Sequence, residues 1–425
     1  MDRLRENTRS VETQRPLYNG VGIGFRVMLY SHDTFGLGHL SRNLKIASAL
    51  KAAYPELSVL IATGSPQAHQ FTIPDGTDYI KLPSVHKVND EGYAARYLGI
   101  TFKRILAVRR SVLLETVRNY EPHILLVDHA PLGMKREIVP CLEWIAANND
   151  KSRAILGLRD ILDSPSSTIE SWTKQGIFEI IRNLYNRIFI YGMPTIFDPV
   201  AEYDFPDDIA FKTRYCGFIT TYNNDGSISN EPEEAQEKLV LVTIGGGDGG
   251  ETVIDDFLKV LRRKKNRSDH KSVILTGPFL SQEKWEAFQK QAEEVGASIF
   301  RYVSDPGSLM KRSALVISTG GYNTMTDILS FASQAVVVPR ILYRKEQLIR
   351  AQRFGDLGLI RFIHPDDLTP ESLGQAIEER LSEPDEKLAE ARADNLLWLD
   401  GASRLARYIG ESLAEIEKTK EKAVC

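Results

Sequence analysis

The sequence predicts an α/β protein built from two doubly wound, Rossmann-like domains that face each other across a cleft. Short β-branched runs alternate with longer helical periods, a pattern typical of parallel sheets covered by helices on both faces. A polar, turn-rich stretch at 221–238 separates two halves that share this rhythm. Glycine-rich loops follow strand runs in both halves, at the strand ends where such sheets bind ligands.

The first domain is expected at 23–220, after a polar and flexible N-terminal extension at 1–22. Its strands are expected where short apolar runs are bounded by turn residues. These runs are Phe25–Tyr30, Ser58–Ala62, Tyr79–Leu82, Ile124–Asp128, Ala154–Leu158 and Ile188–Tyr191. Helical patterns lie between several of them, at Leu40–Ala53, Phe102–Asn119, Lys135–Ala147 and Thr168–Tyr185.

The stretch 221–238 is interpreted as a linker, and the second domain is expected at 239–400. The strand runs of the second domain are Leu239–Ile244, Ser272–Thr276, Ser298–Val303, Leu315–Ser318, Ala335–Pro339 and Ile360–Ile363. A last helical pattern, Ser403–Lys418 within 401–425, has no strand after it. This helix could therefore cross back onto the first domain.

Composition narrows the class of protein. A chain of 425 residues favours two or three domains. The formal net charge of −4 and the ordinary fractions of apolar and charged residues argue against a nucleic-acid-binding protein and against a disordered one. The three cysteines are far apart, so neither a disulfide framework nor a zinc site is expected, and a cytoplasmic setting is favoured. Neither an apolar run long enough to span a membrane nor a secretory signal is apparent.

Three glycine-rich junctions carry the functional signal. Ser318–Asp327 reads Ser-Thr-Gly-Gly-Tyr-Asn-Thr-Met-Thr-Asp and follows a buried strand run directly. A strand that ends in Gly-Gly and opens into a helix presents free N–H groups and a positive dipole end, which suit a diphosphate. Gly245–Gly250 and Gly36–His39 close two further strand runs. Glycine at such a junction can also merely relieve crowding, and the recurrence in both halves favours a shared ligand cleft.

These motifs resemble family 28 of the two-domain glycosyltransferases with the B-type fold. The resemblance covers roughly Phe25–Leu399 and is firmer in the second half. In that family the first glycine loop ends in a histidine that opens the first helix, as Gly38 and His39 do here. The loop before them departs from the family pattern, since Asp33, Thr34 and Phe35 replace small residues.

The resemblance implies a site for a nucleoside diphosphate sugar. Asp327 falls at the position where the family holds the donor ribose. Glu346-Gln347 falls where the family has a pair of glutamines near the donor sugar, and Glu346 departs from that pair because it is charged. The nucleobase is expected against the strand end at Val303, and Arg344 or Lys345 could add a cation. The donor-binding residues implied are Gly38, Gly246, Gly247, Val303, Gly320, Gly321, Asn323, Thr324, Asp327, Arg344, Glu346 and Gln347.

Glycosyl transfer needs an acceptor hydroxyl that loses its proton and a leaving diphosphate whose charge is neutralised. The unperturbed pKa of a histidine suits a general base, and His39 is the candidate, with Asp33 or Asp128 orienting its other ring nitrogen. His39 could instead cap its helix or contact the diphosphate. Helix N-termini and backbone N–H groups are expected to stabilise the diphosphate without a metal or another cofactor.

The expected partners are a nucleoside diphosphate sugar, uridine-based and for example carrying an N-acetylhexosamine, and an acceptor that could be lipid-linked. Leu98–Leu114 combines apolar and basic residues at helical spacing, so it could contact the inner membrane face peripherally, but a core-facing helix explains it equally well and is favoured. A nucleotide-sugar hydrolase or epimerase, and a non-catalytic nucleotide-sugar-binding protein, remain alternatives on the same fold.

Overall fold

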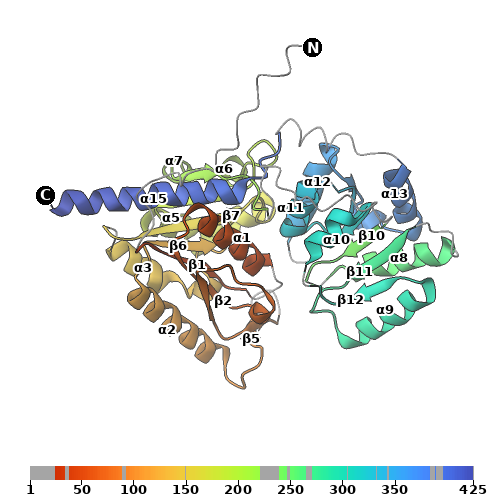
Figure 1. The fold of residues 1–425 in the computed structure, drawn as a ribbon, viewed down its shortest axis with the longest axis horizontal. Helices are drawn as coiled ribbons and strands as arrows, with labels where there is room; N and C mark the ends of the chain where they lie inside the picture. The colour runs from red at the N-terminus through yellow and green to blue at the C-terminus, as the bar shows by residue number, and fades with distance from the viewer. Residues whose placement is uncertain are drawn as a thin grey trace, which may run out of the picture.

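The computed structural model describes residues 24–33, 38–88, 92–148, 150–220, 239–246, 249–264, 270–303, 305–331, 333–341, 344–382, 388 and 396–424. Two α/β lobes lie side by side, the first built from the N-terminal half and the second from the C-terminal half (Figure 1). Each lobe has a parallel sheet with helices on both faces, so the predicted fold class is confirmed.

The first sheet has seven strands in the order β3-β2-β1-β6-β7-β8-β9, all paired in parallel. The strands are β1 (Arg26–Ser31), β2 (Ser58–Thr63), β3 (Thr77–Lys81), β6 (Ile124–Asp128), β7 (Arg153–Arg159), β8 (Arg187–Tyr191) and β9 (Thr213–Tyr215). The central strands are buried apolar runs, as parallel strands covered on both faces must be. The strand order reverses between β1 and β6, and a ligand crevice is expected beyond that point.

The helices of the first lobe are α1 (Gly38–Ala53), α2 (Phe102–Tyr120), α3 (Val139–Ala147), α4 (Pro165–Gln175), α5 (Ile177–Leu184), α6 (Pro199–Glu202) and α7 (Asp207–Ala210). Short 3-10 turns lie at η1 (Ala68–Gln70) and η2 (Met134–Arg136). An antiparallel hairpin, β4 (Val85–Lys87) with β5 (Tyr93–Ala95), precedes α2.

The single helix predicted at Thr168–Tyr185 is wrong. The chain breaks into α4 and α5 at Gly176, whose φ of 65° is left-handed and ends the first helix. The helix predicted from Lys135 begins only at Val139, because Lys135 and Arg136 have positive φ values of 46° and 64°. The hairpin and β9 were not predicted, since runs of three residues carry too little periodicity to be recognised.

The second sheet has six parallel strands in the order β12-β11-β10-β13-β14-β15. They are β10 (Leu239–Thr243), β11 (Lys271–Leu275), β12 (Ser298–Phe300), β13 (Leu315–Ser318), β14 (Ala335–Val337) and β15 (Arg361–Phe362). The helices are α8 (Glu251–Lys264), α9 (Gln282–Val295), α10 (Pro306–Arg312), α11 (Tyr322–Phe331), α12 (Glu346–Asp356) and α13 (Pro370–Ser382), with a 3-10 turn at η3 (Pro365–Asp367). Here the strand order reverses between β10 and β13, the strands followed by the second and third glycine junctions.

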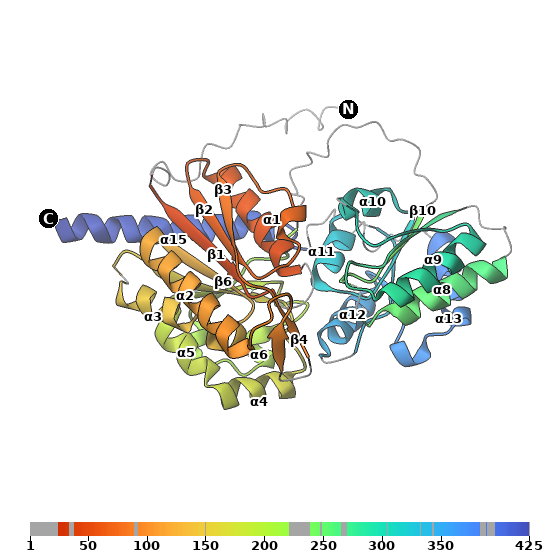
Figure 2. The ribbon, with the colours of Figure 1, turned by 90° about the horizontal axis from the view of Figure 1, so that it is seen from below.

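The last helix, α15 (Gly401–Val424), leaves the second lobe and lies along the first, beside α1 (Figures 1 and 2). Tyr408 stacks on Phe189 of β8 with ring centroids 5.4 Å apart. Gly410 lies so close to the Tyr54 ring that a Cβ there would come within 1.9 Å of the hydroxyl. The C-terminal helix thus shares the core of the first lobe.

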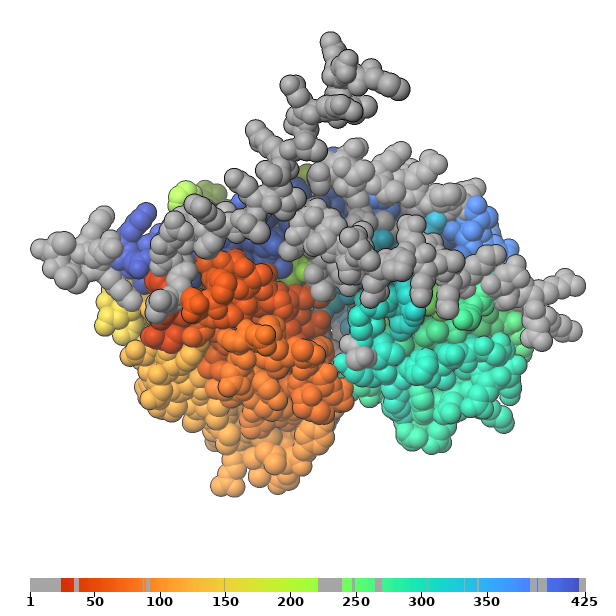
Figure 3. Space-filling view, viewed as in Figure 1, coloured from red at the N-terminus to blue at the C-terminus, as the bar shows by residue number. Residues whose placement is uncertain are grey.

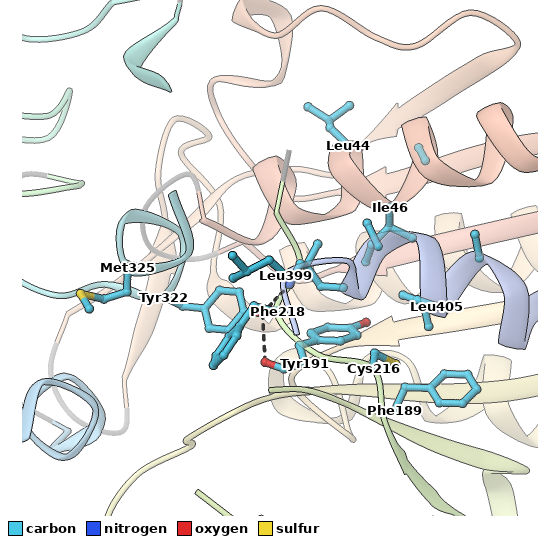
Figure 4. Close-up of a cluster of buried hydrophobic side chains, with 14 of the residues drawn as sticks. Leu44, Ile46, Phe189, Tyr191, Cys216, Phe218, Tyr322, Met325, Leu399 and Leu405 are labelled. Carbon is cyan, nitrogen blue, oxygen red and sulfur yellow. Dashed lines mark hydrogen bonds between the residues drawn. The ribbon is translucent and has the colours of Figure 1, made fainter. Parts of the chain in front are cut away.

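Two backbone segments run together where the lobes join. Phe218 N donates to Trp398 O over 2.7 Å, and Gly401 N donates to Phe218 O over 3.1 Å. Figure 4 shows Phe218 and Leu399 in one buried cluster with Tyr191 of the first sheet and Tyr322 of α11. The two lobes therefore share a continuous core at this junction, and they meet along the boundary visible in Figure 3.

Candidate active site

A cavity of about 1210 Å³ lies between the two lobes. Most first-lobe residues in its wall come from α1 and the segments near it, and Arg159 ends β7. The second-lobe residues follow β10, β11, β12, β13 and β14. The predicted residues that line it are Gly38, His39, Gly246, Val303, Gly321, Asn323, Thr324, Asp327, Glu346 and Gln347. Gly247 is outside the described residues. The cavity thus occupies the strand-order reversals of both sheets, where doubly wound folds bind ligands.

His39 and Asp128 meet because neighbouring strands β1 and β6 end at the same edge of the first sheet. His39 opens α1 directly after the glycine loop, and its Nδ1 lies 2.6 Å from Asp128 Oδ2. Arg42, one turn further along α1, donates from Nε to Asp128 Oδ1 over 2.9 Å and from Nη2 to Oδ2 over 2.6 Å. Arg42 and Asp128 are buried, whereas His39 lies in the cavity wall.

The environment of Asp128 keeps it ionised. Burial alone would raise the pKa of Asp128, but the charge of Arg42 and the hydrogen bond from His39 outweigh burial and hold it well below its ordinary value. An ionised Asp128 accepts the Nδ1 proton of His39, and Nε2 is left as the ring nitrogen that can take a proton from a ligand. The other predicted carboxylate, Asp33, accepts instead from Ser31 Oγ and Thr63 Oγ1, each over 2.5 Å.

The third glycine junction meets the first across the cavity. Asn323 Nδ2 of α11 donates to Gly38 O over 3.0 Å, so the N-termini of α11 and α1 lie together. Gly320 has a φ of 73°, and a Cβ there would come within 2.9 Å of Val337, so only glycine fits. Gly320 itself is outside the cavity wall, which Gly321 and Thr319 form. Two helix dipoles therefore favour an anion here.

Asp327 lies in the cavity wall and is paired with a residue that the sequence did not single out. Lys45 of α1 donates from Nζ to Asp327 Oδ1 over 2.8 Å. The second carboxylate oxygen of Asp327 has no partner among the described residues and can accept from a ligand hydroxyl. On the same wall, Val303 lies in the loop after β12, which ends at Phe300.

Glu346 and Gln347 open α12 at the edge of the cavity. Gln347 Oε1 accepts from Arg340 N over 3.1 Å. Glu346 Oε2 lies 2.9 Å from Arg159 Nη1 of the first lobe and 3.3 Å from Arg350 Nη2. Burial alone would raise the pKa of Glu346, but Arg159 and Arg350 lower it to about 2. The charge that replaces the family's amide is therefore compensated by an arginine from the opposite lobe.

Arg344 lies beside the cavity and outside its wall. It is exposed, and its Nη1 donates to His129 Nε2 over 3.3 Å. Burial, together with Arg159, His39 and Arg344, holds the pKa of His129 well below its ordinary value, so His129 is neutral and can accept this hydrogen bond at Nε2. Arg159 of the first lobe, in contrast, lines the cavity, so it can supply there the positive charge predicted for Arg344.

Substituting Glu346 with Gln should reduce the dependence of stability on pH. Because the folded pKa of Glu346 is depressed to about 2, its ionised form contributes stability that is fully present above about pH 5 and is lost as pH falls through about 2. Wild type should therefore lose on the order of 3 kcal/mol more unfolding free energy than Glu346→Gln over that interval. Urea unfolding at matched pH values measures this difference, and identical pH profiles would contradict the Arg159 pairing.

The helix predicted as a possible membrane contact packs one face against the interior. In α2 the apolar residues Ile105, Leu113 and Val117 are buried. Arg109 is also fully buried, and it donates to both carboxylate oxygens of Glu137 over 2.6 Å. The favoured alternative, a core-facing helix, thus describes this face of α2. In the described parts of the chain, no helix is both long and apolar enough to cross a membrane.

The described residues contain no group of three or more His, Cys, Asp and Glu side chains placed to hold a metal ion. The site also depends on residues that sequence reasoning missed: Arg42, Lys45, Arg159 and Asp160. The spacing of Arg42 three residues after His39 places both on one face of a helix, which is a usable signal. The others act across the two lobes, and no local pattern marks them.

Comparison with known proteins agrees with this fold. Residues 239–406 match the model of the glycosyltransferase family 28 C-terminal domain. A UDP-N-acetylglucosamine--N-acetylmuramyl-(pentapeptide) pyrophosphoryl-undecaprenol N-acetylglucosamine transferase from Lactococcus lactis is 28% identical over 197 residues, 46% of this chain and 53% of the relative. The chain thus spans about half the length of the curated relatives it matches.

Solved structures match over a larger part of the chain. MurG from Acinetobacter baumannii superposes with a TM-score of 0.56 at 14% identity, covering 91% of this chain and 99% of that one. A UDP-glucosyltransferase from Polygonum tinctorium gives a TM-score of 0.62 at 14% identity, covering 94% and 99%. Residues 239–406 therefore resemble the glycosyltransferase family 28 C-terminal domain, and the chain as a whole has the two-domain fold of the B-type glycosyltransferases.

Proposed function

We propose that the protein transfers a sugar from a nucleoside diphosphate sugar to an acceptor hydroxyl, with His39 as the general base. The observation that carries this proposal is the meeting of two unlike halves in one cavity. A buried, ionised Asp128 orients His39 from the first lobe, and the N-terminus of α11 presents an anion site from the second. Base and leaving-group site are the two requirements of glycosyl transfer.

In the proposed reaction the acceptor oxygen attacks the anomeric carbon of the donor sugar while its proton passes to His39 Nε2. The bond from that carbon to the diphosphate oxygen breaks, and the electron pair leaves with the nucleoside diphosphate. Asp128 stabilises the imidazolium that forms, through the 2.6 Å contact at Nδ1. The helix dipoles at Gly38 and Tyr322, with Arg159 in the cavity wall, stabilise the charge that grows on the diphosphate.

The donor we propose is uridine-based. The names of the matched relatives support this choice, since the Lactococcus lactis protein uses UDP-N-acetylglucosamine and the Polygonum tinctorium protein is a UDP-glucosyltransferase. On this chain the ribose would bind Asp327 through the carboxylate oxygen that Lys45 leaves free, and the base would pack against Val303. The wall near Glu346 and Gln347 would receive the donor sugar.

Calorimetric titration with UDP, GDP and ADP tests this donor site, with tight binding of UDP as the expected result. Replacing Asp327 with Asn should weaken UDP binding about tenfold, because the ribose hydroxyl would then donate to a neutral amide oxygen in place of a carboxylate oxygen.

Two variants control this test. Lys45→Met also removes the pair between the lobes but keeps the Asp327 carboxylate, so it should weaken binding less than Asp327→Asn. Asp366→Asn alters an exposed carboxylate of the same lobe and should leave the dissociation constant unchanged. Equal dissociation constants for wild type and Asp327→Asn would show that the ribose does not bind there.

A further inference from the structure

Tyr322, the first residue of α11, lies between two buried arginines. Its ring centroid is 5.3 Å from Arg42 Cζ of the first lobe and 5.7 Å from Arg350 Cζ of the second. Each arginine also holds a first-lobe carboxylate through two hydrogen bonds, Arg42 with Asp128 and Arg350 with Asp160. The five side chains form a continuous buried row that starts at the partner of His39 and crosses the boundary between the lobes.

The hydroxyl of Tyr322 is also held by the first lobe. It donates to Tyr191 O over 3.0 Å and accepts from Ile219 N over 3.0 Å. Tyr191 ends β8, and Ile219 lies in the segment that leads toward the second lobe. Figure 4 shows Tyr322 reaching from α11 toward Tyr191 and Phe218. Both the ring and the hydroxyl of this second-lobe side chain therefore depend on the lobes being together.

Arg42 depends on the same contact. Its guanidinium lies 5.7 Å from the Tyr191 ring centroid, so Arg42 contacts one aromatic ring from each lobe. Arg42 is only 1% exposed, and cation–π contacts are strongest in such desolvated positions. If the lobes separated, Arg42 would lose the Tyr322 ring and gain water. Its two hydrogen bonds to Asp128, which set the position of the acceptor for His39 Nδ1, would then no longer be constrained.

We propose that Tyr322 is a positioning residue that couples closure of the two lobes to the arrangement of the His39–Asp128 pair. The inference rests on the proposed role of His39 as the base. The position of the base then depends on the donor-binding lobe. His39 is held correctly only when α11, which carries the donor anion site, packs against the first lobe. Water entering an open cleft would then meet a poorly arranged base, which limits hydrolysis of the donor.

Two substitutions separate the ring of Tyr322 from its hydroxyl. Tyr322→Phe removes both hydrogen bonds but keeps the stack on Arg42, so its kcat should fall much less than that of Tyr322→Leu. Tyr322→Leu removes the stack, and its kcat should fall about tenfold or more, the size expected for a desolvated cation–π contact. The dissociation constant for UDP should change less than about threefold in both, since the contact positions the base.

Nuclear magnetic resonance of protein labelled with 15N-histidine gives a readout independent of turnover. The His39 signals, assigned by their loss in His39→Gln, should show a protonated Nδ1 in wild type and in Tyr322→Phe. In Tyr322→Leu the Nδ1 proton should exchange faster with water or the tautomer should become mixed. Unchanged His39 signals in Tyr322→Leu, or a loss confined to UDP affinity, would overturn the proposal.

A double variant tests whether Tyr322 acts through Arg42. Arg42→Lys keeps the charge but loses the planar group that stacks and binds Asp128 twice. The combination with Tyr322→Leu should lower kcat no further than Arg42→Lys alone, and additive losses would overturn the proposal. Should Tyr322→Leu not fold, Tyr322→Met carries the same comparison. If no donor is turned over but the His39 signals respond to Tyr322→Leu, the coupling stands and the proposed function fails.

Discussion

Replacing His39 with Gln is expected to lower kcat by about a hundredfold to ten-thousandfold, the range that general base catalysis contributes. Gln has a similar length but cannot take the acceptor proton. Because the substitution leaves Asp327, Val303 and Gln347 of the second lobe in place, UDP affinity should change much less than kcat. Initial rates of sugar transfer and calorimetric UDP binding measure the two effects separately.

Asp128→Asn should also lower kcat, since a neutral amide cannot stabilise the imidazolium. It should destabilise the fold as well, because Arg42 would remain buried without a carboxylate.

His364→Gln is the matched control for His39→Gln, because it makes the same substitution at a histidine that lies at η3, outside the cavity wall. This control variant should retain full activity. A His39→Gln protein as active as wild type would remove the base assignment.

Replacing Asp160 with Asn is expected to lower the free energy of unfolding by about 3–5 kcal/mol, the usual cost of breaking a buried ion pair. Asp160 accepts from Arg350 Nη2 and Nε over 2.7 Å each, and the two side chains are only 4% and 1% exposed. With an amide at 160, Arg350 would keep a buried charge between the lobes. Urea unfolding monitored by circular dichroism and by tryptophan fluorescence measures the loss.

An exposed pair in the first lobe provides the control. Arg182 and Asp208 make the same two-point contact, but their side chains are 44% and 47% exposed. Asp208→Asn should therefore destabilise the protein far less than Asp160→Asn. If Asp160→Asn and Asp208→Asn destabilised the protein equally, the Asp160–Arg350 pair would not hold the lobes together.

The sequence was most informative where structure is local. Alternating strand and helix patterns predicted both sheets, because parallel strands buried on two faces are continuous apolar runs, as in Ile124–Asp128. The glycine junctions were recognised for a similar reason, since a strand, a glycine pair and a helix start are adjacent in the chain. The break at Gly176 was missed because apolar residues keep a helical period on both sides of it.

Long-range contacts could not be read from the sequence. Asp33 and Asp128 were both candidates for orienting His39, and the pairing of β1 with β6 brings Asp128 to it. Lys45 and Asp327 are separated by 282 positions. The pairs between the lobes depend on how two separately folded sheets dock, and neither periodicity nor spacing encodes that arrangement.

Charged groups of the two lobes contact each other at Glu346, a position where the sequence departs from the family pattern. A glutamate at 346 would be costly in an apolar wall, yet here Arg159 and Arg350 compensate it. The departure from the family's amide therefore comes with an arginine from the opposite lobe. We interpret Glu346 as part of the contact between the lobes as well as of the cavity wall.

The most direct test of the central claim is transfer of a radiolabelled sugar from UDP-sugars to fractionated cell extracts that contain lipid-linked and soluble acceptors. We predict that the label enters a larger product only when an acceptor fraction is present, that UDP is released in equal amount, and that His39→Gln abolishes both. Release of free sugar at the same rate with and without acceptor fractions would contradict the account and indicate a hydrolase. Donors left intact in every fraction would contradict it as well, and would favour a non-catalytic binding protein.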